Sequence, residues 1–99
     1  MNRNQVVIEG TIAETALLRY TPAGIPVSEF RLIHESRQSE AGQDRAVQVE
    51  LSVLVMGDAA LEIAKIPGGS EVAVKGFLSR RSQKSDYPVL HVNQFKLFK

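Results

Sequence analysis

Two short segments of the chain combine basic side chains with a tyrosine. Cations neutralise phosphates and an aromatic ring can stack on a base, which is how many proteins hold single-stranded nucleic acid. The simpler interpretation of each basic residue in these segments is a solvated surface charge with no ligand. The first segment contains Arg19 and Tyr20, and the second contains Arg80, Arg81, Lys84 and Tyr87.

Signals of catalysis or metal binding are weak by comparison. His34-Glu35 begins like the zinc-binding motif HExxH, but Gln38 stands where the second histidine should be, and the segment has the pattern of a strand rather than a helix. The Gly-Gly-Ser at residues 68–70 lacks the spaced Gly-Lys-Ser/Thr of a phosphate-binding loop. His91 alternates with apolar neighbours, which favours a structural role. We expect no enzyme activity, no metal and no cofactor.

The composition is that of a folded protein, with 43% hydrophobic and 23% charged residues among 99, and this length supports one domain over residues 1–99. The net charge of +1 does not demand a polyanionic partner. However, residues 38–65 carry two basic and five acidic side chains, whereas residues 66–99 carry six basic and two acidic ones. The basic character therefore lies in the last third.

Nothing in the sequence indicates a membrane or an oxidising compartment. The N-terminus lacks the apolar run of a signal peptide, and no stretch approaches the ~20 apolar residues of a membrane-spanning helix. Cysteine is absent, which excludes disulfides and thiolate ligands. We expect a soluble, cytoplasmic protein with no membrane partner.

Apolar and polar residues alternate in short blocks, which indicates an antiparallel β domain. A first strand is predicted over residues 5–13, with a bend at Gly10, and it continues over residues 17–20. A turn at residues 21–24 leads to a second strand over residues 26–35. The charged face of this second strand, which carries Arg31, should meet solvent or a ligand.

A long, mobile, polar loop is predicted over residues 36–44, before the strongest alternation in the chain at residues 45–56. Asp58 is expected to cap a helix over residues 59–65. A fourth strand around Val72 and Val74, with a bend at Gly76, precedes a basic loop over residues 80–87 and a fifth strand over residues 89–97. The residues expected to point inward from the third strand are Val47, Val49, Leu51, Val53 and Val55.

Five strands with a helix between the third and fourth is the element order of an OB-fold barrel. Spacing alone leaves an SH3-like barrel or an open sheet under a helix as alternatives. In an OB barrel the first turn and the last loop flank the outer face of strands two and three, so the two tyrosine-containing segments converge there. The predicted DNA-binding residues are Arg19, Tyr20, Arg31, Arg45, Arg80, Arg81, Lys84 and Tyr87.

Three blocks of sequence resemble the amino half of bacterial single-stranded DNA-binding proteins. These blocks are VVIEGTI at residues 6–12, LRYTPAGIPV at residues 18–27 and EFRL at residues 29–32. VKGFLS at residues 74–79 and VLH at residues 89–91 make the chain more similar to the primosomal branch of that family. General members usually carry a disordered acidic tail, whereas this sequence stops at Lys99, directly after the last expected strand, which also favours this branch.

The resemblance implies a non-enzymatic homodimer of OB-folds that acts in the restart of stalled replication forks. It implies binding of single-stranded DNA and of the PriA helicase, which the protein would stimulate, followed in some bacteria by the loader DnaT. The alternative is a protein-interaction adaptor whose OB face mainly binds the helicase, with incidental DNA contact. Apolar Val7, Ile33 and Leu54 on otherwise polar faces give the homodimer partial support.

Carried over by position, the DNA-contacting basic residues of the family fall on Arg19 and Lys84, with Arg81 or Ser82 at a further position. Other positions depart from the family pattern. Glu35 replaces a basic residue, Gln43 replaces an aromatic residue, and Gln48 replaces a tryptophan. Since stacking is worth roughly 1 to 3 kcal/mol per base, we expect DNA binding that is weaker and more salt-sensitive than in the family, without sequence preference.

Overall fold

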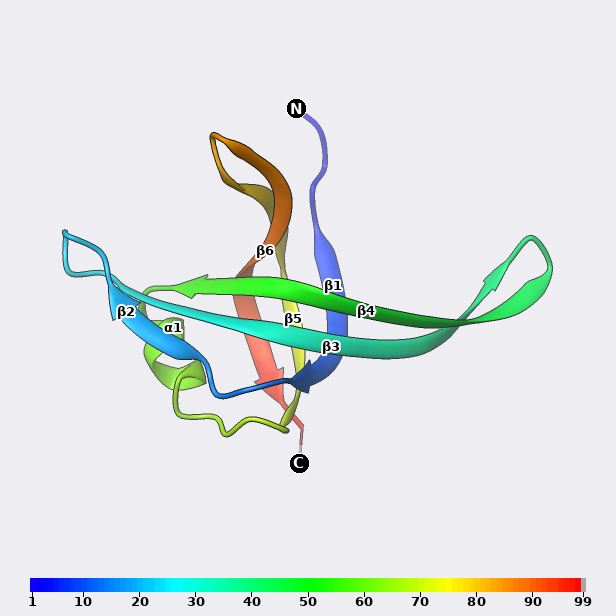
Figure 1. Ribbon diagram of the computed structural model, residues 1–99, viewed down its shortest axis with the longest axis horizontal. Helices are drawn as coiled ribbons and strands as arrows, with labels where there is room; N and C mark the ends of the chain where they lie inside the picture. Colours follow the sequence, from blue (N-terminus) through cyan, green and yellow to red (C-terminus); the bar gives the residue numbers. More distant parts are fainter. Residues whose placement is uncertain (99) are drawn as a thin grey trace.

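The computed structural model describes residues 1–98, and within them six strands and one helix build a small barrel from which hairpins project (Figure 1). The long hairpin makes the molecule 50 Å in its largest extent. The elements are β1 (Val6–Ile12), β2 (Leu17–Tyr20), β3 (Pro26–Glu40), β4 (Gln43–Met56), α1 (Asp58–Ile63), β5 (Glu71–Ser82) and β6 (Ser85–Leu97).

The strand pairing closes the sheet on itself. The order is β1-β5-β6-β4-β3-β2, and β1 also pairs with β3 through Ile12 and Leu32. Because β2 pairs with β3 as well, β1 and β2 together occupy the first position of a five-stranded barrel. The predicted OB-fold is therefore confirmed, with its helix between the third and fourth positions, and the open-sheet alternative is wrong.

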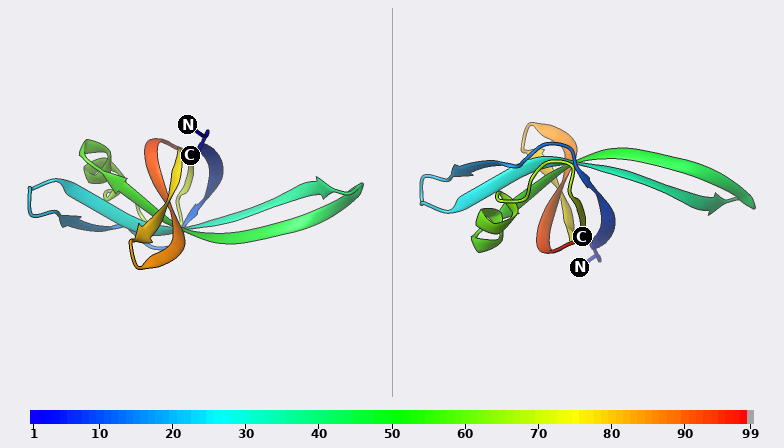
Figure 2. Two further views of the ribbon diagram at one scale, coloured as in Figure 1. Left: turned by 90° about the horizontal axis from the view of Figure 1, so that it is seen from above. Right: turned by 90° about the horizontal axis from the view of Figure 1, so that it is seen from below.

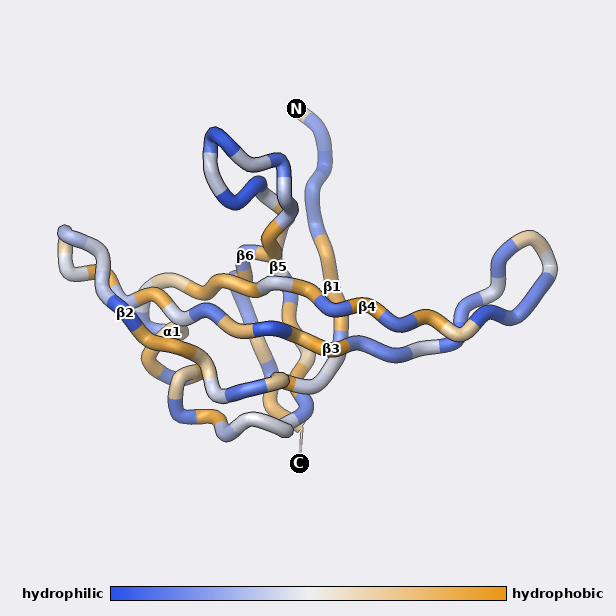
Figure 3. Tube along the Cα trace, in the orientation of Figure 1, coloured by the Kyte–Doolittle hydropathy of each residue, from blue (hydrophilic) through white to orange (hydrophobic). Residues whose placement is uncertain are grey.

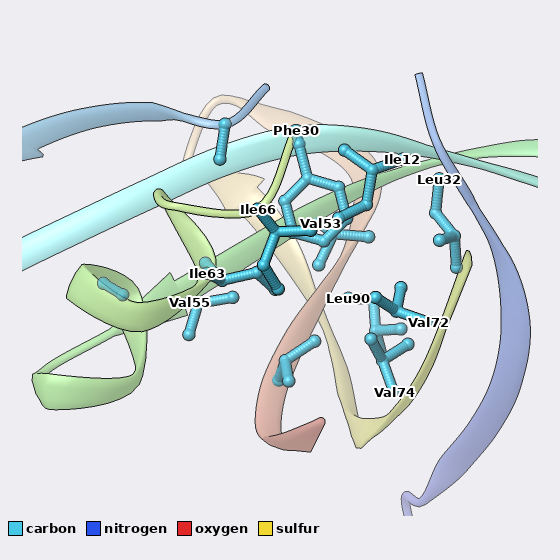
Figure 4. Close-up of a cluster of buried hydrophobic side chains, with 13 residues drawn as sticks. Ile12, Phe30, Leu32, Val53, Val55, Ile63, Ile66, Val72, Val74 and Leu90 are labelled. Atoms are coloured by element: carbon cyan, nitrogen blue, oxygen red, sulfur yellow. The ribbon is translucent and has the colours of Figure 1, made fainter. Parts of the chain in front are cut away.

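The barrel core is made of apolar side chains from β1, β3, β4, β5 and β6, and α1 covers one end of it (Figure 4). Phe30 and Leu32 point inward from β3, as the alternation predicts, and the Ser28 hydroxyl donates a 2.7 Å hydrogen bond to the carbonyl of Ala60 in α1. The helix begins after Gly57 and has no side-chain cap. The predicted Asp58 cap is wrong, since Asp58 already lies in the first turn.

Two glycines permit the close strand contacts that the barrel needs. A Cβ atom at Gly10 would lie 2.5 Å from the carbonyl oxygen of Ile33, where β1 approaches β3. At Gly76 a Cβ would lie 1.8 Å from the carbonyl oxygen of His91. The register of β5 against β6 also shifts between Lys75 and Gly76, which confirms the predicted bend at Gly76.

The predicted loop over residues 36–44 is wrong, because β3 and β4 remain paired as far as Glu40 and Gln43. Ala41 and Gly42, with φ of 53° and 79°, form the turn between them, and two such residues suit a tight hairpin. The hairpin projects away from the barrel (Figure 2). Neither face of this hairpin packs against a core, so its strands form without alternating apolar and polar residues. For the same reason Val49, predicted to point inward, is 41% exposed.

The predicted loop over residues 80–87 is also wrong. β5 continues to Ser82 and β6 begins at Ser85, with a register shift between Arg80 and Ser82. The tip of this hairpin is hydrophilic and points away from the barrel (Figure 3). No helix among residues 1–98 has the length and apolar character needed to cross a bilayer.

Candidate nucleic-acid interface

A pocket on the outer surface of the barrel joins the two basic segments. Its volume is about 330 Å³, and Arg19 of β2 lines it together with Arg80 and Arg81 of β5. The pairing of β2 with β3 places Arg19 in the pocket. The extension of β5 beyond the barrel places Arg80 and Arg81 there. The structure therefore brings together three of the eight residues that the sequence predicts to bind DNA.

Glu29 is the acidic partner of this pocket. It accepts hydrogen bonds from Arg19 and, at 3.4 Å, from Arg81, one through each carboxylate oxygen. Its side chain is 27% exposed, compared with 54% and 53% for the two arginines. Arg80 lies 3.3 Å from Asp86, whose side chain is almost fully exposed. The pocket lining retains an excess of positive charge, since three arginines face one carboxylate there.

Lys84 and Tyr87 lie on the β5–β6 hairpin, outside the pocket lining. Both are exposed, Tyr87 to 55%, and the hydrogen bonds they make are from their backbone N–H groups to serine hydroxyls. Tyr20 follows Arg19 on β2 and is 59% exposed. These three side chains are accessible to a ligand, and in the sequence they lie close to the arginines of the pocket.

Arg31 and Arg45 are not among the residues that line the pocket. Arg31 forms ion pairs with Glu50, at 2.8 Å, and with Glu14, at 3.2 Å. The two carboxylates, Glu50 more strongly than Glu14, raise the pKa of Arg31 above its ordinary value. Arg45 lies 3.2 Å from Glu40 near the far end of the β3–β4 hairpin (Figure 1). Neither Arg31 nor Arg45 therefore lines the pocket with Arg19, Arg80 and Arg81.

The middle of the β3–β4 hairpin is acidic and has no aromatic side chain. Glu35 lies directly opposite Gln48 in the β3–β4 register. These two residues line a shallow hollow with Glu50, Ile33 and Val49, and Gln43 begins β4 at the hairpin tip. Two of the three departures from the family pattern, Glu35 and Gln48, therefore lie side by side, whereas Gln43 lies at the hairpin tip.

The histidines have structural partners. One ring nitrogen of His34 lies 2.7 Å from the carbonyl oxygen of Glu9 and the other lies 2.8 Å from the hydroxyl of Ser36. His91 stacks on Phe77. Within residues 1–98, no three acidic, histidine or cysteine side chains form a group that could hold a metal ion.

The sequence prediction of the pocket omits Glu29, Leu54 and His91, all of which line it. Glu29 lies on the predicted charged face of its strand, but its contact with Arg81 depends on strands that are not neighbours in sequence. Leu54 and His91 come from the parallel pairing of β4 with β6. The alternation of apolar and polar residues along each strand indicates that Leu54 and His91 point outward, but it does not show that the two side chains meet.

A closed barrel with arginines gathered between β2 and the β5–β6 hairpin defines an OB-fold binding protein. The model of a family described as "another single-strand binding protein family" matches residues 4–94. The replication restart protein PriB of Nitrosomonas europaea is 41% identical over 97 residues, which are 98% of this chain and 90% of the relative. PriB of Bordetella pertussis is 38% identical over 92% of this chain and 85% of its own length.

Solved structures agree with these relatives. PriB from Ralstonia solanacearum superposes with a TM-score of 0.87 at 28% identity, over 99% of this chain and 100% of that one. The single-stranded DNA-binding protein from Thermus aquaticus shares the fold, with a TM-score of 0.81 at 24% identity over 98% of this chain and 50% of its own. The chain therefore belongs to the single-strand binding protein family and, within it, to the PriB replication restart proteins. These are binding proteins, so the expectations of family and of no enzyme activity are confirmed.

Proposed function

We propose that this protein binds single-stranded DNA without sequence preference at the pocket between β2 and the β5–β6 hairpin. The observation that carries the proposal is the meeting of Arg19, Arg80 and Arg81 from separate parts of the chain. Phosphates would displace Glu29 and Asp86 as the partners of these arginines. Because those carboxylates compete, the affinity is expected to be low and strongly dependent on salt.

Its proposed role is that of an accessory protein in replication restart. As the names of its PriB relatives state, those proteins are replication restart proteins. By the resemblance, this protein would act as a cytoplasmic homodimer of one-domain OB-folds at stalled forks. It would bind DNA and the PriA helicase together and stimulate that helicase, and in some bacteria DnaT would join the complex.

A protein-interaction adaptor is the second candidate. Glu35 and Glu50 lie on the outer face of the β3–β4 hairpin, and carboxylates there repel a phosphate backbone. Exposed apolar side chains on β2 and in the turn between β2 and β3, including Leu17 and Ile25, are suited to protein contact. In this case the helicase would occupy the OB face and DNA contact would be incidental.

Fluorescence anisotropy distinguishes the two candidates. Labelled oligo-dT and a labelled forked duplex are titrated with the protein at low and at physiological salt, with and without the PriA helicase of the same organism. Binding of oligo-dT that falls with salt, with a slope of about −0.7 per phosphate contact, supports DNA binding. If complexes form only when the helicase is present, the adaptor is correct and the proposed DNA site is wrong.

A further inference from the structure

A row of side chains crosses the outer face of the barrel from the arginine pocket to an aromatic pair. Glu29 on β3 is in register with Leu54 on β4, Leu54 with His91 on β6, and His91 with Phe77 on β5. Neighbouring strands lie roughly 5 Å apart, so the row spans about 15 Å. It runs across the strands, and its first member is the residue that binds Arg19 and Arg81.

The far end of this row consists of two stacked rings. The centroids of Phe77 and His91 are 5.1 Å apart and their planes differ by 16°. Phe77 is 38% exposed, and neither residue belongs to the buried core cluster. The pair is therefore a preformed aromatic surface that the core does not require.

This aromatic surface is continuous with the arginine pocket. A neighbouring hollow of about 160 Å³ is lined by Phe77, Met56 and Asn93, and also by Leu54 and His91. Leu54 and His91 line the arginine pocket as well. An extended ligand can therefore occupy both hollows at once, because Leu54 and His91 line both of them.

We propose that Phe77 and His91 form a base-stacking site for single-stranded nucleic acid whose phosphates are held by Arg19, Arg80 and Arg81. This inference rests on the DNA binding proposed above and adds the site that holds the bases. Aromatic rings beside a cationic groove suit this ligand, because stacking accepts any base and the cations hold the backbone. The site supplies aromatic contact that Gln43 and Gln48 cannot supply on the β3–β4 hairpin.

The test compares the affinity of the protein for a 15-nucleotide oligo-dT with its affinity for an abasic oligonucleotide of the same length. The abasic oligonucleotide keeps the phosphates and lacks the bases. The variants are Phe77→Leu, which removes the ring and keeps apolar bulk, and Phe77→Tyr, which keeps the ring. Phe77→Leu is expected to weaken oligo-dT binding about fivefold or more, with an unchanged salt slope and unchanged abasic binding. Phe77→Tyr should bind both oligonucleotides like the wild type.

A measurement on the wild type provides a second readout that does not depend on the folding of a variant. In NMR titrations, the ring protons of Phe77 and His91 should shift upfield with oligo-dT and not with the abasic oligonucleotide. Wild-type affinity for oligo-dT in Phe77→Leu, or unshifted rings, overturns the stacking site and leaves the proposed DNA binding intact. A wild type that binds neither oligonucleotide overturns the proposed function and this inference with it. Loss of helicase binding alone in Phe77→Leu assigns the rings to a protein partner and overturns the nucleic-acid site.

Discussion

The guanidinium of Arg81 on β5 lies 3.4 Å from a carboxylate oxygen of Glu29 on β3, although 52 residues separate them in the sequence. The other carboxylate oxygen of Glu29 accepts a hydrogen bond from Arg19. One acidic side chain thus holds two cations from opposite sides of the proposed DNA site. It positions both arginines and also competes with any phosphate for them.

Replacing Glu29 by Gln should strengthen binding of single-stranded DNA. The amide keeps the size of the side chain and removes the charge that competes with phosphates for Arg19 and Arg81. Since exposed ion pairs are each worth about 0.2 to 1 kcal/mol and Glu29 makes two, we expect affinity for oligo-dT to rise by up to about thirtyfold. Anisotropy titrations at two salt concentrations measure the change.

Glu62→Gln is the matched control. Glu62 is exposed on α1, so this variant makes the same change in net charge away from the arginines. Affinity in Glu62→Gln should stay near that of the wild type. Equal gains in both variants would mean that total charge alone attracts DNA and that Glu29 has no particular role.

The salt dependence of DNA binding should identify which arginines contact phosphates. Arg81→Gln should make the slope of log affinity against log salt shallower by about 0.7, the value for one contact with a single strand. Arg45→Gln should leave the slope unchanged, because Arg45 pairs with Glu40 away from the pocket. Titrations of oligo-dT at four or more salt concentrations give the slopes, and a reversed pattern would move the site to the β3–β4 hairpin.

Restoring the basic and aromatic residues of the family on the β3–β4 hairpin should increase affinity. Glu35 and Gln48 are opposite one another, so Glu35→Arg together with Gln48→Trp creates a cation beside a ring. The expected gain is about tenfold, because stacking contributes roughly 1 to 3 kcal/mol per base. Anisotropy with oligo-dT measures this gain.

The single variants separate the two contributions. Glu35→Arg should steepen the salt slope, whereas Gln48→Trp should raise affinity with little change in slope. Unchanged affinity in the double variant would show that the hairpin is not part of the DNA path and that its departures do not weaken binding.

Gly76→Ala should destabilise the barrel strongly. The new Cβ atom would lie 1.8 Å from the carbonyl oxygen of His91, so β5 and β6 must separate where they carry Phe77 and His91. We expect a loss of about 3 kcal/mol in the free energy of unfolding, at the upper end for overpacking. Urea denaturation followed by circular dichroism measures it.

Gly24→Ala provides the comparison for this stability measurement. Gly24 has a φ of +85° and no atom within 4 Å of a Cβ placed there. Alanine in this left-handed conformation costs about 1 to 2 kcal/mol through backbone strain alone. A loss in Gly76→Ala no larger than that in Gly24→Ala would contradict the steric explanation.

Local patterns were sufficient for much of the fold. The inward faces of Phe30, Leu32 and Val53 follow from a two-residue period, which any strand with one buried face must show. The same rule failed where burial ends. Residues 36–44 are polar because both faces of the outer hairpin meet water, so their polarity predicts a loop where the strands in fact remain paired.

The sequence by itself determined the element order of the barrel, the glycine at the β5 bend, and the basic character of the segments around Arg19 and Arg81, since composition and short-range spacing encode these features. The tertiary structure decided which of those charges meet. The parallel pairing of β4 with β6 and the antiparallel pairing of β6 with β5 place Leu54, His91 and Phe77 in one row. Such contacts depend on strand order and register, which are set by the closure of the whole barrel rather than by any local pattern.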